Sequence, residues 1–346
     1  MARAADAVTS HSMALSLRIS QRGSVQYPRT KGQCVHQETQ TVEEGVATRV
    51  SEVSLDGVDR RLRMFRAGHE VDTFVLLTRR YAVAVDTMST PEEMTAVMEL
   101  VRDGLAGRQL LVVNTHADYD HAWGNAVFAT PDGAYPAPII AHRHVAERLR
   151  DPAMERYLRQ RQQAEPRYAA VRLIPPTVTF SDRLRIDGGD LTLELIPTPG
   201  HTDDHVAVWI PELRLLLAGD AAEQPIPYVN APSDLPTLRA SIRLLAALDP
   251  ATVIPCHGGT TDPGLLARNL AYFDLLDRTV GSAAAEGRVP RDWATRENLP
   301  DALGLPYEEA LRAVGIDPAT VSEPDFYRAS HLRAVRAVVA NLSPPH

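Results

Sequence analysis

Two histidines and two aspartates lie within six consecutive residues of the stretch NTHADYDHAWGN, residues 114–125. They are His116, Asp118, Asp120 and His121. On a helix, residues three or four positions apart share a face, so Asp118 would point away from His116 and Asp120. A loop after the apolar run 110–113 removes that restriction. We therefore expect a loop at the end of a strand to carry these four side chains together.

Three further residues of the same types follow other apolar runs. His201 comes after TPG and the run LTLELI, Asp220 ends LRLLLAG, and His257 ends ATVIPC just before two glycines. Ligand-binding residues commonly gather where the carboxyl ends of strands meet at one edge of a sheet. Imidazole nitrogens and carboxylate oxygens are ligands for divalent metals. The complete set of four histidines and three aspartates is sufficient for two metal ions.

The pattern around these residues predicts an α/β fold. Short apolar runs with turn residues between them predict strands near 60–67, 73–78, 81–86 and 109–115, and again between 177 and 219 and at 251–256. Thr90-Pro91-Glu92-Glu93 is typical of a helix start, and LPTLRASIRLLAAL predicts an amphipathic helix over 235–248. Strands in two clusters with helices between them predict two sheets packed face to face and covered outside by helices.

The chain divides by pattern into three parts. We expect residues 1–45 to form a mobile N-terminal tail, because they lack periodic apolar runs. Residues 46–275 form the domain that carries the seven residues, and 276–346 form a C-terminal helical extension packed on it. A lid over the site and a homodimer interface remain alternatives for the extension.

Composition excludes several classes of function. The chain has 346 residues, a net charge of −8 and dispersed arginines, which disfavours nucleic acid and anionic membrane surfaces as partners. Its two cysteines, Cys34 and Cys256, have neither disulfide nor thiolate-zinc spacing, and no apolar signal core precedes residue 30. We expect a cytoplasmic protein with a small-molecule substrate.

The ordered motifs HADYDH, TPGHTDDH, AGDA and PCHGG resemble those of the metallo-beta-lactamase superfamily. Each motif alone is weak evidence, but their order and strand-end placement together are specific. The resemblance covers roughly residues 58–260. It implies an αββα sandwich of two mixed β-sheets flanked by helices, so that 46–275 would be a metallo-beta-lactamase-like domain.

The resemblance also implies roles for the seven residues. One metal ion would be bound by His116, Asp118 and His201, the other by Asp120, His121 and His257, and Asp220 would bridge them. A hydroxide between the ions would attack a small-molecule ester, lactone, thioester, amide or phosphodiester. Asp120 would act as the catalytic residue that orients this nucleophile or takes its proton. The implied function is thus a binuclear metal-dependent hydrolase.

Asp118 departs from the commonest pattern of the family, which has histidine at this position. A carboxylate in place of a neutral imidazole makes the site less positive and favours harder ions. The resemblance favours zinc as the cofactor, with manganese and iron as the alternatives. Two other functions remain open: an iron-dependent oxidoreductase of the persulfide dioxygenase or flavodiiron type, and a non-catalytic metal-binding protein.

Overall fold

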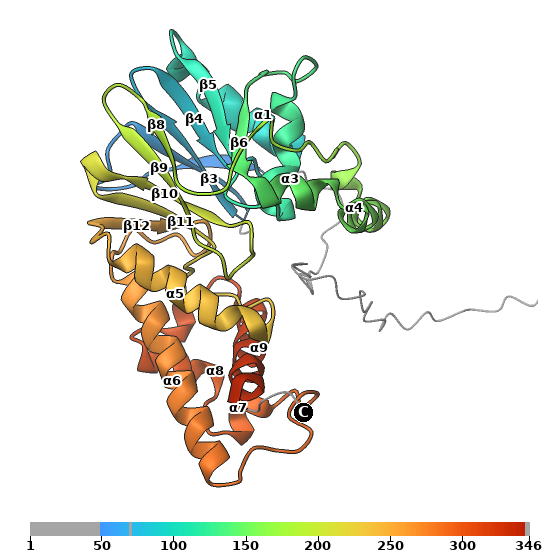
Figure 1. Cartoon of the computed structure of the whole chain (residues 1–346), viewed down its shortest axis with the longest axis vertical. Coiled ribbons are helices and arrows are strands. Elements are labelled where there is room, and N and C mark those ends of the chain that lie inside the picture. The colour runs from blue at the N-terminus through green and yellow to red at the C-terminus, as the bar shows by residue number, and fades with distance from the viewer. Residues whose placement is uncertain (1–48, 69–70, 343–346) are drawn as a thin grey trace, which may run out of the picture. The chain divides into compact units, whose positions relative to one another are not determined.

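Two β-sheets lie at the centre of the residues that the computed structural model describes, 49–68 and 71–342. These residues belong to one compact unit, and the expected N-terminal tail, 1–45, lies outside the described residues. The first sheet has the order β1-β2-β3-β4-β5-β6-β7 and the second has the order β12-β11-β10-β9-β8. Figure 1 shows the two sheets stacked, with helices on the outside of each. The predicted αββα sandwich is confirmed.

The first sheet is antiparallel from β1 to β4 and parallel from β4 to β7. Its strands are β1 (Val50–Val53), β2 (Leu62–Ala67), β3 (Val71–Leu77), β4 (Tyr81–Val85), β5 (Gln109–Val113), β6 (Ile139–His142) and β7 (Val178–Phe180). The second sheet is antiparallel except where β11 pairs with β12. Its strands are β8 (Leu184–Asp187), β9 (Thr192–Pro197), β10 (Val206–Ile210), β11 (Leu215–Gly219) and β12 (Thr252–Pro255).

Strands β10 and β11 of the second sheet are buried on both faces, because neither of them contains a polar side chain. Along β11, Leu215 and Leu217 belong to the cluster between the two sheets, whereas Leu216 and Ala218 belong to the cluster under the outer helices. This division follows from the alternation of side chains along a strand. The second sheet therefore packs against the first sheet on one face and against the outer helices on the other.

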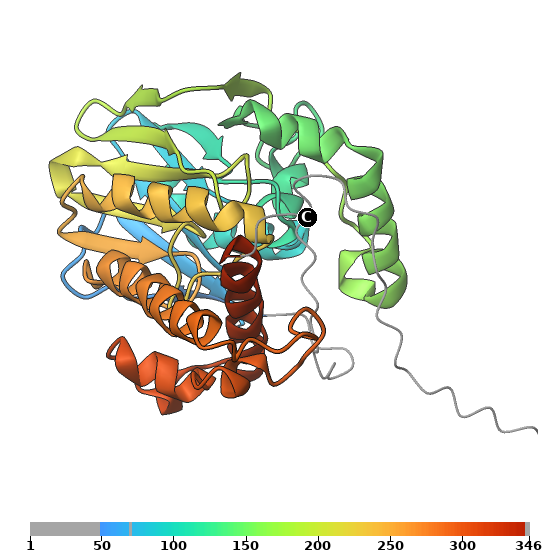
Figure 2. The same ribbon diagram turned by 60° about the horizontal axis from the view of Figure 1, so that its bottom comes forward.

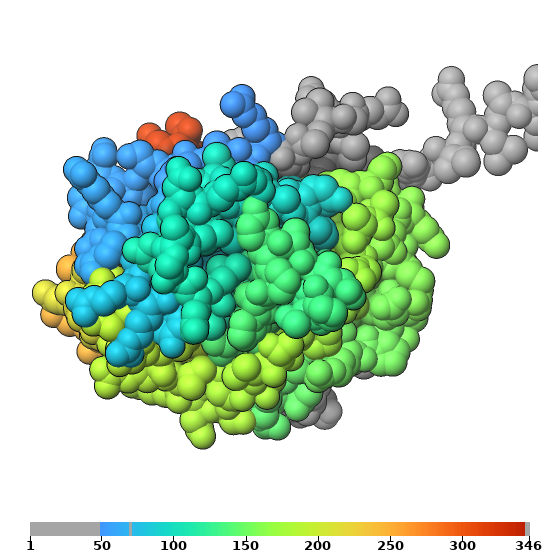
Figure 3. Space-filling view, turned by 90° about the horizontal axis from the view of Figure 1, so that it is seen from above, coloured from blue at the N-terminus to red at the C-terminus, as the bar shows by residue number. Residues whose placement is uncertain are grey.

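Helices cover the outside of both sheets. Those of the first half are α1 (Pro91–Leu100), α2 (Tyr119–Ala122), α3 (Arg143–Arg150) and α4 (Pro152–Ala164). Those of the second half are α5 (Leu235–Ala246), α6 (Leu265–Ala285), α7 (Leu299–Ala302), α8 (Tyr307–Ala313) and α9 (Pro324–Leu342). Figure 2 shows α5 and α6 side by side over the second sheet, and Figure 3 shows that segments from the first half cover the opposite face. None of the helices among the described residues is both long and apolar enough to cross a membrane.

The start of α1 matches its sequence signal. The Thr90 side chain accepts a hydrogen bond from the Glu93 N–H, and the Glu93 carboxylate accepts one from the Ser89 N–H. Proline is well placed in the first turn, where its missing N–H costs nothing. These two hydrogen bonds fix the first turn of the helix.

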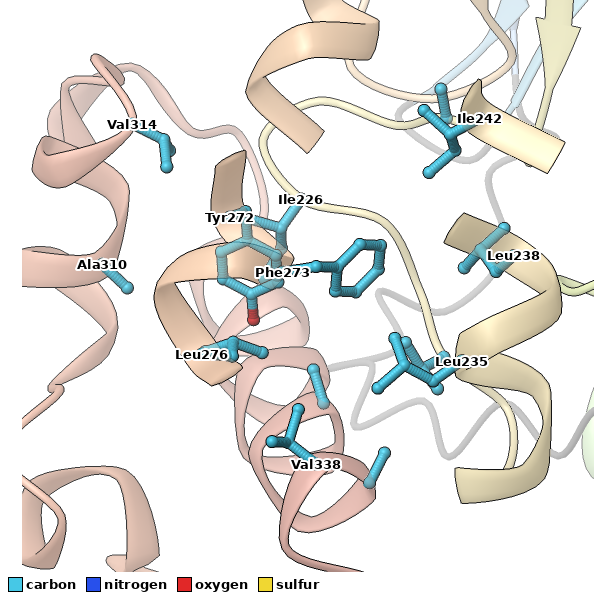
Figure 4. Packing of buried hydrophobic residues seen from close by; sticks show 14 of the residues in the cluster. Ile226, Leu235, Leu238, Ile242, Tyr272, Phe273, Leu276, Ala310, Val314 and Val338 are labelled. Atoms are coloured by element: carbon cyan, nitrogen blue, oxygen red, sulfur yellow. The ribbon is translucent and has the colours of Figure 1, made fainter. Parts of the chain in front are cut away.

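The C-terminal helices share a hydrophobic cluster with the second sheet. In Figure 4, Phe273 and Leu276 of α6 lie among side chains of α5, α8 and α9, and the same cluster includes Trp209 of β10. The predicted boundary at 275/276 falls within α6, which continues through it. The division into a domain 46–275 and an extension 276–346 therefore remains a prediction about folding units.

Candidate metal centre

The seven predicted residues meet at one edge of the two sheets. His116 and Asp118 follow β5 in a loop, and Asp120 and His121 lie on the single-turn helix α2. The expectation of a loop is therefore correct for the first half of the motif and wrong for the second. The remaining three residues follow strands of the second sheet, namely His201 after β9, Asp220 after β11 and His257 after β12.

Asp220 occupies the centre of this group. Its Oδ2 atom lies 3.3 Å from Nε2 of His121 and 3.4 Å from Nε2 of His257. The same oxygen lies 3.5 Å from Nε2 of His201 and 3.6 Å from Nε2 of His116. One carboxylate oxygen thus faces four imidazoles that come from three segments: the one after β5, which carries two of them, and those after β9 and β12.

Asp118 and Asp120 divide these histidines into two pairs. The Oδ2 atom of Asp118 lies 3.5 Å from Nε2 of His116 and 3.4 Å from Nε2 of His201. The Oδ2 atom of Asp120 lies 3.5 Å from Nε2 of both His121 and His257. Two compact groups of possible ligands lie here, His116-His201-Asp220 and Asp120-His121-His257, and a third group, Asp86-His121-Cys256, lies behind His121.

Buried hydrogen bonds orient the histidines from behind. Nδ1 of His121 lies 2.9 Å from Oδ2 of Asp86, and Nδ1 of His116 lies 3.0 Å from the Thr115 hydroxyl. Asp86 also accepts hydrogen bonds from the N–H and the hydroxyl of Thr115. Such outer contacts fix the orientation of a ligating imidazole, with its other nitrogen aimed at the metal.

His205 orients Asp220 through the backbone. Its Nε2 accepts the Asp220 N–H at 2.9 Å, while its Nδ1 contacts the Thr198 hydroxyl at 2.8 Å. Burial, together with nearby His116 and His201, holds the pKa of His205 well below its usual range. The neutral ring can therefore act as an acceptor.

Glycine is required immediately before Asp220. Gly219 has a φ of +55°, and a Cβ atom there would lie 2.5 Å from Nε2 of His205. A side chain would thus collide with the ring that holds the Asp220 backbone, in a conformation that already favours glycine.

The site concentrates negative charge in a buried space. Burial opposes ionisation, yet His121 and His257 hold the pKa of Asp220 well below its usual range. Burial alone would lower the pKa of His257, but Asp220, Asp120 and Glu223 raise it to about 10. Carboxylates that raise the pKa of a buried histidine mark a place where positive charge is stabilised.

The residues present fit a pair of divalent metal ions. Nε2 of His116, Nε2 of His121 and Oδ1 of Asp220 are buried and have no hydrogen-bond partner among the described residues. Buried polar atoms without such partners are costly, and metal coordination would remove that cost. Nitrogen and oxygen donors in small sets suit zinc, and also suit manganese or iron.

Sequence reasoning missed several supporting residues. Asp86 directly follows strand β4, so the strand-end rule that selected Asp220 could have selected it. Asp204 lies within TPGHTDDH beside a second aspartate, and the motif does not distinguish the two. Arg148 contacts both Asp118 and Asp204 at 2.6 Å from helix α3. Nothing in its local pattern distinguishes it from the other arginines of that helix.

Sequence comparison finds a family model and relatives that cover the part of the chain carrying these residues. The family model of the metallo-beta-lactamase superfamily matches residues 68–257. A hydroxyacylglutathione hydrolase of Rhodospirillum rubrum is 26% identical over 260 residues, which cover 72% of this chain and 91% of that protein. A hydroxyacylglutathione hydrolase of Fuscovulum blasticum is 27% identical over 244 residues, which cover 67% of this chain and 83% of that protein.

Solved structures share the fold at low sequence identity. A metallo-beta-lactamase family protein from Thermus thermophilus has a TM-score of 0.53 at 18% identity, with 85% of this chain and 94% of that chain covered. A metallo-beta-lactamase from Pontibacter korlensis has a TM-score of 0.50 at 20% identity, with 64% and 98% covered. Because the family model matches more than half of the residues, this chain belongs to the metallo-beta-lactamase superfamily.

Proposed function

We propose that the protein is a binuclear metal-dependent hydrolase of a small molecule. The observation that carries the proposal is the position of Asp220, whose Oδ2 faces Nε2 of four histidines at 3.3, 3.4, 3.5 and 3.6 Å. Asp118 and Asp120 stand on either side of it, each against one pair of histidines. A central carboxylate that faces two pairs of histidines suits a two-ion centre.

The proposed ligands follow from these contacts. His116, Asp118 and His201 would hold one ion, Asp120, His121 and His257 the other, and Asp220 would contact both. Two divalent ions, zinc first among them, would polarise the scissile bond and lower the pKa of a bound water.

The protein's own groups prepare the site for this chemistry. Asp86 and Thr115 fix two imidazoles from outside, and His205 fixes Asp220. Asp120 is the proposed proton acceptor. Its buried carboxylate lies between His121, which follows a strand of the first sheet, and His257, which follows a strand of the second. Burial of the ligands excludes bulk water and strengthens each electrostatic contact.

The first substrate class to test is a carboxylic thioester. Two relatives that align with about two thirds or more of this chain are named hydroxyacylglutathione hydrolase, and that name describes a thioester-cleaving activity for those proteins. Simple esters, lactones, amides and phosphodiesters use the same attack on an electrophilic centre and form the rest of the panel.

The test is turnover by metal-free protein before and after addition of zinc, manganese or iron. We expect no hydrolysis without metal, and saturable hydrolysis of one substrate class after addition of two equivalents. Hydrolysis that is insensitive to metal removal would reject the proposal. Oxygen consumption by the iron-loaded protein, with no hydrolysis of any panel member, would favour the oxidoreductase instead.

A further inference from the structure

Arg148 connects the two loops that carry three of the proposed ligands. It extends from α3, donating from Nη2 to Oδ1 of Asp118 and from Nη1 to Oδ1 of Asp204, both at 2.6 Å. Its side chain is only 13% exposed, and those of the two aspartates are 2% and 0% exposed. A guanidinium is suited to such a contact, because its planar fork can donate to two carboxylates in fixed directions.

The two oxygens of Asp118 have different surroundings. Oδ1 accepts the hydrogen bond from Arg148, whereas Oδ2 faces Nε2 of His116 at 3.5 Å and Nε2 of His201 at 3.4 Å. Oδ2 is therefore the oxygen that faces the two histidines, while Arg148 holds Oδ1. An aspartate whose outer oxygen was not held could rotate and offer both oxygens to an ion.

Asp204 extends the contact to the backbone of the first motif. Its Oδ2 accepts the N–H of Ala117, the residue between His116 and Asp118, at 3.0 Å. Arg148 and Asp204 together thus hold the loop 116–118 against the loop that carries His201.

We propose that Arg148 is a positioning residue that makes Asp118 a one-oxygen ligand. Arg148 would thereby favour zinc over larger ions at the site of the ion that His116, Asp118 and His201 would hold. This inference rests on the proposed metal centre and goes beyond it, because it assigns a determinant of metal choice. Zinc is bound mostly by four ligands, whereas larger divalent ions accept more oxygens, often two from one carboxylate. A carboxylate restricted to one oxygen suits the smaller coordination number.

The test compares zinc and manganese binding by metal-free wild type, Arg148→Met and Arg150→Met. Arg150 lies on the same helix with an exposed side chain, so it controls for loss of a positive charge. Competition with a chromophoric chelator gives the affinity of each site. Loss of an outer contact to a ligand commonly costs about 10–100-fold in metal affinity. We expect Arg148→Met to weaken one of two zinc sites by that factor, to weaken manganese less, and Arg150→Met to match wild type.

A second comparison, Asp118→His with and without Arg148→Met, distinguishes two roles of Arg148. Arg148 could position Asp118, or it could only hold the two loops together. If Arg148 acts through Asp118, its removal should matter much less in an Asp118→His background. An equal loss in both backgrounds would overturn the proposal and leave Arg148 as a link to Asp204 only. Unchanged zinc and manganese affinities in Arg148→Met would also overturn it.

The remaining outcomes are also decisive. Arg148→Lys keeps the charge but not the fork, so we expect an intermediate affinity, and this variant replaces Arg148→Met if the latter does not fold. Wild type that binds two ions, with no effect of Arg148, would reject this inference alone. Wild type that binds no divalent ion would reject the proposed function as well.

Discussion

Asp220 is the residue on which the proposed centre depends most. Because its Oδ2 faces all four histidines, replacing the carboxylate should affect both ions at once. We expect Asp220→Asn to retain less than one ion per chain and to lose at least about 100-fold in kcat/KM, more than loss of an outer contact costs. Elemental analysis and kinetics would measure this. Asp262→Asn, which alters an exposed ion pair with Arg268, is the control.

A second prediction concerns Gly219. Comparing a substitution there with one at Gly107 separates the cost of backbone strain from the cost of a steric clash. Gly219→Ala would place a Cβ atom 2.5 Å from Nε2 of His205, whereas Gly107, with a φ of +74°, has no atom within 4 Å of that position. Both substitutions should cost about 1 kcal/mol of stability from the positive φ. Only Gly219→Ala should also weaken metal binding. Equal metal affinities in the two variants would contradict the role of His205.

The sequence predicts all seven residues that meet at this edge, because each follows a recognisable apolar strand. The outer contacts are harder to predict. Arg148 reaches Asp118 from a helix 30 positions later in the chain, and a charged helix gives no sign of which arginine turns inwards. Its role depends on tertiary packing that no local pattern contains.

Among the elements, long periodic patterns are the most predictable. The expected helix 235–248 corresponds to α5 (Leu235–Ala246), and the expected strand 251–256 corresponds to β12 (Thr252–Pro255). Helix α2 could not be predicted in this way, since its four residues form a single turn and show no period. Packing of the loop against the sheets decides its conformation.

Helix α9 contains a buried histidine that makes stability depend on pH. His331 contacts the Tyr272 hydroxyl through Nδ1 at 2.8 Å and the Leu305 carbonyl oxygen through Nε2 at 2.9 Å. Burial lowers its pKa, so the folded state binds a proton less readily than the unfolded chain. The stabilisation is therefore complete above the unfolded pKa of about 6.5 and is lost as the pH falls below it.

The variant His331→Gln isolates this contribution. We expect it to cost about 1–3 kcal/mol in the free energy of unfolding at pH 8, where the neutral imidazole keeps both hydrogen bonds. The cost should be smaller at pH 5.5, because protonation already penalises the wild type. Denaturant titrations at the two pH values measure the difference. A cost that is the same at both would show that His331 does not titrate in this way.

Considered as a whole, the molecule joins its C-terminal helices to the second sheet through one hydrophobic cluster. Leu276 of α6 lies in that cluster with Trp209 of β10, immediately after the predicted boundary at 275/276. The sequence alone does not show that position 275 lies inside a helix. The change of pattern near it also does not reveal whether the segments before and after it share a core. Shared packing predicts one cooperative unfolding unit for the described residues.

Calorimetry of Leu276→Ala tests this cooperativity. We expect a single transition, destabilised by about 2–5 kcal/mol, since the substitution leaves a cavity in the shared cluster. Leu244→Ala, at a side chain 40% exposed, should change stability by less than about 0.5 kcal/mol. Two separate transitions, with only the later residues affected, would instead support an independent extension.

The most direct test of the proposed metal centre is the number of zinc ions bound per chain after equilibrium dialysis of metal-free protein, determined by elemental analysis. The position of Asp220 between two pairs of histidines predicts two ions per chain at saturation. Saturation at one ion would contradict a binuclear centre. No bound zinc, manganese or iron would contradict the assignment of these seven residues as ligands.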